Sequence, residues 1–222
     1  MVSHASHSQP IAILIVDDHH LLLKGTIDLV RERFPHAKIH SARTVEDTLA
    51  QVKERNPHLA ILDLSIPKTA GTKAYVENGL ELLQALMADY PDLNLTIQSS
   101  TIKALVRLIP EIDRHPGGFT IADKSLPVET FLTLLDWSLQ GLSYTKGLQT
   151  DLEVKPEWLT VLKLAFEEGL QDKAIAQKMY KSERTIRHYW SKIQDSLEIY
   201  PEEGKNMRTM TQIRAREAGL LD

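Results

Sequence analysis

The sequence contains no cysteine among its 222 residues. Disulfides and thiolate metal sites are therefore excluded, and the absence fits a reducing compartment. The N-terminal region also lacks a long hydrophobic run, because its continuous apolar stretch covers only residues 11–16. That stretch is too short for a signal-peptide core or a membrane span. From these absences we expect a cytoplasmic protein with no membrane association.

The chain lacks an excess of positive charge, since 26 Lys and Arg face 30 Asp and Glu, for a net charge of −4. Net charge alone therefore does not point to nucleic acid as a partner. The basic residues are concentrated locally: residues 173–192 hold six Lys or Arg and one Glu. This stretch predicts a basic patch, not a basic domain.

Five short apolar runs alternate with helical patterns in the first part of the chain. The runs, which we expect to be strands, cover residues 11–16, 38–42, 59–64, 93–98 and 119–122. Apolar residues at helical spacing predict helices over residues 21–34, 45–55, 80–90, 102–114 and 127–139. A strand–helix unit repeated five times predicts an α/β domain over residues 10–140, with a doubly wound five-stranded parallel sheet.

The strand patterns stop after residue 140. Residues 141–154 contain two glycines and several polar side chains, and we expect them to form a linker. Helical spacing then predicts helices over residues 156–168, 172–178, 182–197 and 207–218. Residues 155–222 are therefore expected to form a small all-α domain.

Polar side chains follow the predicted strands where ligands of such a sheet bind, beyond the carboxyl ends. The residues concerned are Asp17, Asp18, Asp63, Ser99 and Lys124. Asp17 or Asp18 together with Asp63 can hold Mg²⁺, which prefers oxygen ligands. Asp63 could then attack phosphorus, with Ser99 and Lys124 donating to the phosphoryl oxygens. Any one acid at a strand end is more often a solvated cap, but the combination favours a site.

These segments resemble the receiver domains of two-component response regulators, over residues 11–140. "ILIVDDHHLLLKG" is similar to their acidic-pair segment, "LAILDLSIP" to the phospho-acceptor segment, and "NGLELLQAL" to the helix start that follows. The resemblance implies Asp63 as phospho-acceptor, Asp17 and Asp18 with Asp63 at a Mg²⁺ site, Ser99 as the switch hydroxyl and Lys124 as the family's lysine. It also implies a sensor histidine kinase as a partner.

The chain departs from the receiver pattern in two places. The segment between Asp63 and Gly79, around "KTAGTKAY", is longer than the family norm and lies beside the expected phosphorylation site, where it could gate it. Lys124 comes later than usual, so the fifth strand is expected to bulge or to run longer. Ile121 stands at the usual position of the aromatic switch residue, which leaves Phe119 as an alternative.

Two further groups favour structural roles. His19 and His20 are adjacent and diverge around a helix start, so solvated or capping roles are favoured over a metal pair. Trp137, Trp158 and Trp190 fall at apolar helical positions, and we expect all three in the core.

The segment "LQDKAIAQKMYKSERTIRHYWSKIQDSL" predicts two helices with a short connection, the second capped by Ser182. Apolar residues follow one side of the second helix: Ile186, Tyr189 or Trp190, Ile193 and Leu197. Polar and basic residues lie away from it: Arg184, Arg187, His188, Ser191 and Lys192. A helix of this kind can enter a major groove, although an amphipathic helix with a solvated basic face is an equally common reading.

The same segment resembles the LuxR-type helix-turn-helix of the NarL/FixJ class, over residues 155–222. The resemblance implies base contacts from Arg184, Ile186 and Arg187. It implies phosphate contacts from Lys173, Thr185, His188 and Lys192. The resemblance also implies three partners: double-stranded DNA, a second copy of the chain in an active homodimer, and RNA polymerase.

The leading hypothesis is a DNA-binding transcription regulator that phosphorylation at Asp63 controls. The alternative is a regulator of the same fold that acts through protein contacts without phosphorylation, which the long segment and the displaced Lys124 favour. A phosphatase with an aspartate nucleophile would need a second acid two residues on, and Asp63-Leu64-Ser65 lacks it. We therefore do not expect an enzyme.

Overall fold

The computed structural model describes residues 10–146, 148 and 155–221. The chain divides into two compact units, one of Met1–Ile102 with Pro110–Lys146 and one of Lys103–Ile109 with Gly147–Asp222. The segment Lys103–Ile109 thus groups with the second unit although it lies within the range expected for the first domain. In the described part of the chain, no helix has the length and apolar character needed to cross a bilayer.

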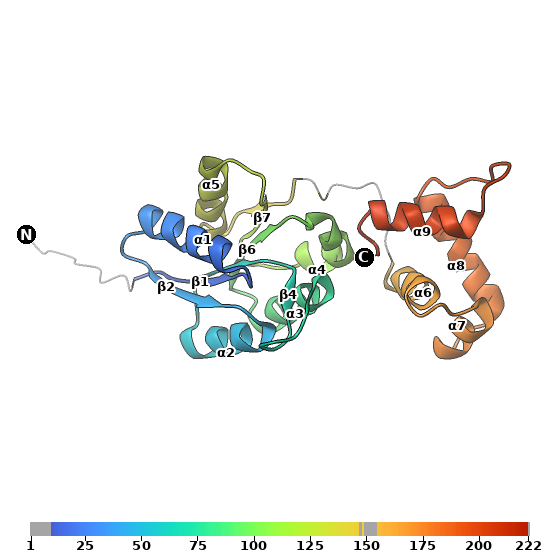
Figure 1. Cartoon of the computed structure of the whole chain (residues 1–222), viewed down its shortest axis with the longest axis horizontal. Helices are drawn as coiled ribbons and strands as arrows, with labels where there is room; N and C mark the ends of the chain where they lie inside the picture. The colour runs from blue at the N-terminus through green and yellow to red at the C-terminus, as the bar shows by residue number, and fades with distance from the viewer. Residues whose placement is uncertain (1–9, 147, 149–154, 222) are drawn as a thin grey trace, which may run out of the picture. The chain divides into compact units, whose positions relative to one another are not determined.

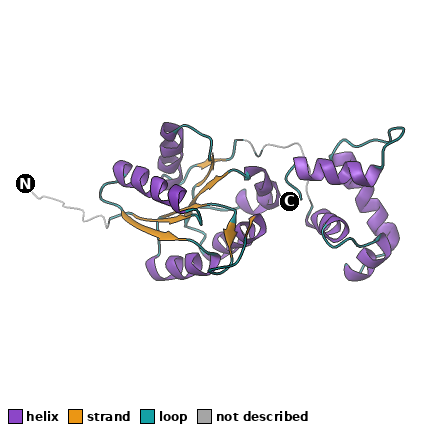
Figure 2. Ribbon diagram, viewed as in Figure 1, coloured by secondary structure: helices purple, strands orange, loops and turns teal. Residues whose placement is uncertain are grey.

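The first unit is built around a parallel sheet with strand order β2-β1-β3-β6-β7-β8 (Figure 2). Its strands are β1 (Ala12–Val16), β2 (Lys38–Ala42), β3 (Leu59–Leu62), β6 (Asn94–Ser99), β7 (Phe119–Asp123) and β8 (Ser143–Tyr144). Every residue of β1 and β3 is buried. Helices cover both faces of these central strands, which explains why they read as continuous apolar runs. The predicted doubly wound α/β fold is confirmed.

The sixth strand, β8, corrects the prediction of five strands. It lies within residues 141–154, which the sequence predicts as a linker, and pairs with β7 so that Phe119 faces Ser143 and Thr120 faces Tyr144. Two residues are too few for a periodic signal, so the strand forms only because the edge of β7 is available. The Tyr144 ring packs edge-on against Trp137, with centroids 5.3 Å apart. Trp137 is 37% exposed, so its predicted place in the core is wrong.

Four helices flank the sheet, and they are α1 (His20–Arg33), α2 (Val45–Arg55), α3 (Val76–Asp89) and α5 (Val128–Leu139). Helices α1 and α5 pack on one face, and α2 and α3 on the other (Figure 1). The helix predicted over residues 102–114 is instead a 3-10 segment, η1 (Ile102–Leu108), followed by one turn, α4 (Ile109–Ile112). Helix α3 begins before the predicted residue 80, within the segment that lengthens the receiver pattern.

That longer segment contains a small antiparallel hairpin of β4 (Ile66–Pro67) and β5 (Ala74–Tyr75). Asn78, in the first turn of α3, donates from Nδ2 to the carbonyl of Ile66 at 2.9 Å. The next residue, Gly79, lies so close to the chain after Asp63 that a Cβ on it would be 2.0 Å from the carbonyl oxygen of Leu64. Helix α3 is therefore seated directly against the backbone that carries Asp63.

The second unit contains α6 (Pro156–Phe166), α7 (Asp172–Lys178), α8 (Glu183–Ser196) and α9 (Met207–Glu217). Ser182 is the N-cap of α8, as predicted, and its Oγ accepts from the backbone N–H of Thr185 at 3.1 Å. Trp190, 4% exposed, and not Tyr189, completes the apolar stripe of α8. Trp158 and Trp190 both lie in the core of this unit, which confirms their prediction.

The close approach of α3 gives a stability test. Gly79→Ala is expected to lower the free energy of unfolding by about 3 kcal/mol, because backbone must move to accept the methyl group. Gly25→Ala in α1, where a Cβ meets nothing within 4 Å, is the matched control. It is expected to raise stability by about 0.5–1 kcal/mol through helix propensity. Urea titration followed by circular dichroism measures both, and equal effects would contradict the packing argument.

Candidate functional site

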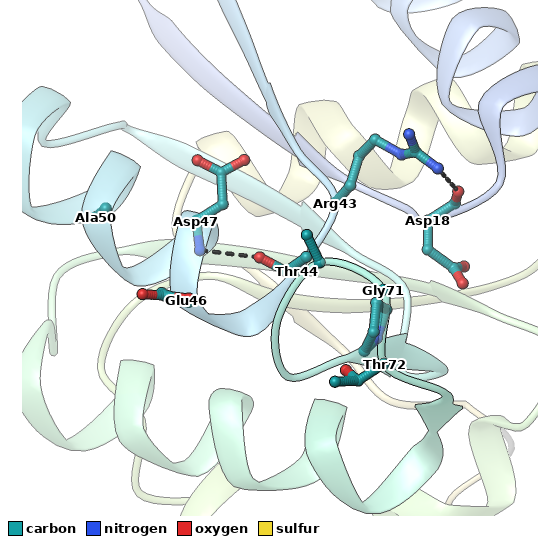
Figure 3. A pocket seen from close by; sticks show the side chains of 10 residues that line it. Asp18, Arg43, Thr44, Glu46, Asp47, Ala50, Gly71 and Thr72 are labelled. Atoms are coloured by element: carbon teal, nitrogen blue, oxygen red, sulfur yellow. Dashed lines mark hydrogen bonds between the residues drawn. The ribbon is translucent and has the colours of Figure 1, made fainter.

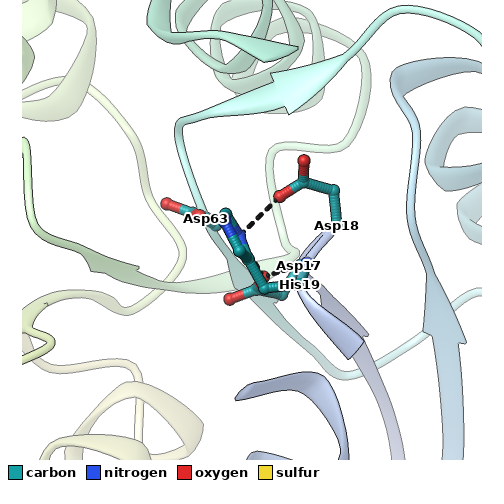
Figure 4. Close-up of side chains that lie close together, drawn as sticks. All are labelled: Asp17, Asp18, His19 and Asp63. Carbon is teal, nitrogen blue, oxygen red and sulfur yellow. Dashed lines mark hydrogen bonds and ion pairs between the residues drawn. The ribbon is translucent and has the colours of Figure 1, made fainter. Parts of the chain in front are cut away.

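The acidic residues predicted at the carboxyl edge of the sheet do lie together. Asp17 directly follows β1 and Asp63 directly follows β3, two neighbouring parallel strands, and the two side chains are almost fully buried. One ligand atom each from Asp17, Asp18, His19 and Asp63 lies within 4.8 Å of the others (Figure 4). Parallel strand ends thus bring into contact residues that are far apart in the sequence.

Lys124 occupies the centre of this cluster. Its Nζ lies 2.8 Å from Asp17 Oδ2 and 2.7 Å from Asp63 Oδ2. Of the two predicted alternatives, a bulge or a longer fifth strand, the structure has the longer strand. β7 extends past the predicted residue 122 and pairs with β6 in regular register as far as Asp123 opposite Ser99, and Lys124 follows at once. Burial by itself would lower the pKa of Lys124, but hydrogen bonds and charge from the two carboxylates outweigh burial, so its pKa lies above the usual value. The ammonium is therefore charged at neutral pH.

Asp63 has both carboxylate oxygens engaged. Ser99 Oγ donates to Oδ1 at 2.8 Å, and the backbone N–H of Ser65 donates to the same atom at 3.3 Å. Oδ2 accepts from Lys124. The longer segment between Asp63 and Gly79 thus does not disturb the pairing of Asp63 with Ser99.

The donor set fits a divalent cation. Asp18 Oδ1 is a buried carboxylate oxygen to which no described residue donates a hydrogen bond. His19 Nδ1 lies 2.8 Å from it and would form an ion pair only when the ring is protonated. The cluster thus offers three carboxylates, one of which has a buried oxygen that accepts no hydrogen bond from a described residue. Such hard oxygen ligands are the ones that Mg²⁺ prefers.

Both histidines are exposed, which agrees with the solvated roles predicted for them, but each also contacts charged neighbours. His19 precedes α1 without making a side-chain cap, and its backbone N–H donates to Asp17 Oδ1 at 2.7 Å. Its ring belongs to the acidic cluster, which its position next to two aspartates could have signalled. His20 points elsewhere and pairs through Nε2 with Arg43 Nη1 at 2.8 Å.

The β4–β5 hairpin lies beside this cluster. The backbone N–H of Glu46, in the first turn of α2, donates to the Lys68 carbonyl at 3.1 Å and ties the hairpin to α2. Between them is an open cavity of about 650 Å³, bordered by Asp18, Arg43, Thr44 and Gly71 among others (Figure 3). Arg43 closes one side by donating from Nη2 to the Asp18 carbonyl at 2.7 Å.

Neither of the two positions considered for the family's aromatic switch residue, 121 and 119, is at the surface. Ile121 is 3% exposed, and Phe119 is fully buried, with its ring edge-on to His115 at a centroid distance of 6.4 Å. The described fold therefore holds both side chains in the core.

The basic residues predicted on the second unit are mostly exposed. Solvent reaches Lys173, Arg184, Arg187, His188 and Lys192, and partly Thr185. Ile186 is an exception, because it is fully buried in the core of the unit. Its predicted base contact is therefore wrong: the residue anchors α8 and cannot reach a base edge.

One carboxylate joins three helices of the second unit. Asp172, at the start of α7, accepts from Arg208 Nη2 at 2.7 and 2.9 Å and from Trp190 Nε1 at 3.1 Å. The Arg208 guanidinium also stacks on the Trp190 ring, 3.5 Å from its centroid. This contact, which the sequence patterns do not reveal, fixes α8 relative to α7 and α9.

Comparison with known proteins agrees with this geometry. Residues 13–109 match the family described as the response regulator receiver domain. The part of the chain that carries the acidic cluster is therefore a receiver domain.

The likeness to relatives extends beyond that domain. The chain is 24% identical over 223 residues to the DNA-binding transcriptional activator DevR/DosR of Mycobacterium tuberculosis, covering 93% of this chain and 94% of the relative. It is 23% identical over 212 residues to the transcriptional regulatory protein LnrK of Bacillus subtilis, covering 85% and 91%. The receiver match thus covers residues 13–109, and the likeness to these two transcriptional regulators covers most of the chain.

A solved structure shows the same fold. RcsB from Salmonella enterica serovar Typhimurium, bound to promoter rprA in the presence of the phosphomimetic BeF3⁻, matches with a TM-score of 0.56. The two chains share 19% identity, and the match covers 92% of this chain and 98% of RcsB.

The central place of Lys124 gives a second stability test. Lys124→Met leaves the buried carboxylates of Asp17 and Asp63 without a counter-charge, so we expect the free energy of unfolding to fall by about 3 kcal/mol at neutral pH. Adding Asp63→Asn should recover part of that loss. Lys24→Met, on the exposed side of α1, is the control and should change little. Denaturant titration of these chains, together with the Asp63→Asn single variant and the wild type, measures the coupling, and no coupling between Lys124 and Asp63 would contradict the ion-pair assignment.

Proposed function

We propose that this response regulator binds DNA to control transcription and that a phosphoryl group on Asp63 regulates that binding. The observation that carries the proposal is Asp63 itself: a buried carboxylate held between the Ser99 hydroxyl and the Lys124 ammonium, beside two further acids. Phosphorylation would shift the chain between two states with different access to DNA.

The geometry supports phosphoryl transfer to Asp63. A carboxylate oxygen of Asp63 forms a bond to phosphorus while the phosphorus–nitrogen bond of a phosphohistidine breaks, and the departing imidazole takes a proton from solvent. Lys124 and Ser99 already donate to the Asp63 carboxylate and would donate to the phosphoryl oxygens instead. The phosphohistidine donor that we propose is a sensor histidine kinase.

Asp17, Asp18 and Asp63 would hold Mg²⁺ in this proposal. When bound, the ion would neutralise charge on the phosphoryl oxygens. The residues of the chain prepare for that charge in a second way, because Lys124 stays protonated between the carboxylates of Asp17 and Asp63.

Phosphorylation is the first test. Incubation with acetyl phosphate and Mg²⁺ is expected to add one hydroxylamine-labile phosphoryl group, visible by intact mass spectrometry. Asp63→Asn should abolish the addition and Asp18→Asn should slow it and raise the Mg²⁺ concentration required. Asp28→Asn, exposed on α1, is the matched control. An unmodified wild-type chain would favour the alternative that the regulator acts through protein contacts alone.

The second unit supports DNA binding through its exposed cations. Arg184 and Arg187 lie one turn apart near the start of α8, where a major-groove helix contacts base edges. We propose that they contact bases and that Lys173, Thr185, His188 and Lys192 contact phosphates. Buried Ile186, with Trp190, holds the helix in place from behind.

DNA binding is the second test. Arg184→Ala and Arg187→Ala are each expected to weaken binding to a selected duplex by about 1–3 kcal/mol and to relax specificity. Lys192→Ala should weaken binding to all sequences and reduce the salt slope by about 0.9. Arg216→Ala, near the end of α9, is the control. Anisotropy titrations at several salt concentrations measure these effects, and unchanged affinity in both α8 arginine variants would remove the DNA assignment.

The remaining parts of the proposal concern assembly and place. We propose that the receiver begins at residue 10 and extends through β8 to residue 146, and that the DNA-binding domain covers residues 155–222. The active species is a homodimer, so that two copies of α8 read two half-sites of a duplex. We place this activity in the cytoplasm, with RNA polymerase as a further partner.

A further inference from the structure

Tyr180 lies in the turn between α7 and α8 and is exposed to an unusual extent. Its side chain is 95% exposed, more than any other large hydrophobic side chain that the structure describes. An isolated apolar residue on a surface needs no explanation by itself. The backbone at Tyr180, however, makes this residue type costly at this position.

The backbone of Tyr180 has φ +54, in the left-handed region. The N–H of Tyr180 donates to the Gln177 carbonyl at 3.2 Å, and the N–H of Lys181 donates to the Ala176 carbonyl at 2.9 Å. These bonds define a helix end at which glycine is usual, because a Cβ is disfavoured there. Neither backbone geometry nor packing therefore accounts for tyrosine.

The same unit contains a close comparison at the end of α8. Glu198 has φ +53, its N–H donates to the Asp195 carbonyl at 3.1 Å, and the N–H of Ile199 donates to the Gln194 carbonyl at 2.9 Å. Gly219 ends α9 with φ +79. Glu198 thus shares the backbone conformation of Tyr180 but lies at the opposite end of α8.

The surroundings of Tyr180 are those of a surface that meets an anion. It precedes Glu183, the first residue of α8, by three positions, so its Cα lies within about 11 Å of that helix start. Lys181 and Arg184, on either side of the Ser182 cap, are both exposed. A tyrosine hydroxyl can donate a hydrogen bond to a phosphate oxygen while the ring covers the sugar.

We propose that Tyr180 is a DNA-contacting residue whose hydroxyl donates to a backbone phosphate next to the bases read by α8. The inference rests on the proposed function of the second unit. The turn points the Tyr180 side chain away from the protein, where a bound duplex could contact it.

The test compares Tyr180→Gly, Tyr180→Phe and Glu198→Gly in the full chain. The probes are a labelled duplex enriched from a random pool by the wild-type chain, and bulk genomic DNA as a nonspecific competitor. Tyr180→Phe is expected to weaken binding about tenfold and Tyr180→Gly about twentyfold, as loss of a hydrogen bond to a charged group predicts. The salt slope should not change, since tyrosine carries no charge.

Thermal unfolding separates this role from a structural one. Tyr180→Gly and Glu198→Gly both relieve the left-handed strain, so neither should lower the melting temperature, and Glu198→Gly should bind DNA like the wild type. The inference is overturned if Tyr180→Gly binds within twofold of the wild type, if it melts earlier, or if Glu198→Gly loses as much affinity. A wild-type chain that fails to bind DNA would instead remove the proposed function itself.

Discussion

The receiver site depends on one buried ammonium between two buried carboxylates. Without Lys124, the charges on Asp17 and Asp63 would face each other in a poorly hydrated pocket, and separating them would pull apart the ends of β1 and β3. With it, the two carboxylates have a counter-charge that donates a hydrogen bond to each of them. The same ammonium is the group that, in the proposed function, would donate to a phosphoryl group on Asp63.

A few short-range contacts also fix the segment that follows Asp63. Gly79 lets α3 touch the backbone at Leu64, and Asn78 binds the Ile66 carbonyl, so the chain leaving Asp63 is fixed within a few residues. The β4–β5 hairpin can therefore be inserted next to the site without displacing Asp63 from Ser99.

In the second unit, a polar network fixes the position of α8. It consists of Asp172, Trp190 and Arg208. Asp172 accepts hydrogen bonds from both other side chains, and the guanidinium stacks on the indole. Helix α8 is thereby fixed from its buried side, and its cations remain free to face a partner. The resemblance implied a base contact for Ile186, whereas the helical spacing of apolar residues on α8 placed it in the core. The structure agrees with the spacing, because Ile186 is buried.

The sequence alone determined the alternation of strands and helices, the acidic residues at strand ends, and the cap and apolar face of α8, because these are properties of spacing within a short segment. Only the tertiary structure decided that β8 joins the sheet, that Lys124 needs no bulge to reach Asp63, that His19 enters the cluster, and that Trp137 stays at the surface. Each of those outcomes depends on which distant segment lies alongside, and that is set by packing across the whole unit, which no local pattern encodes.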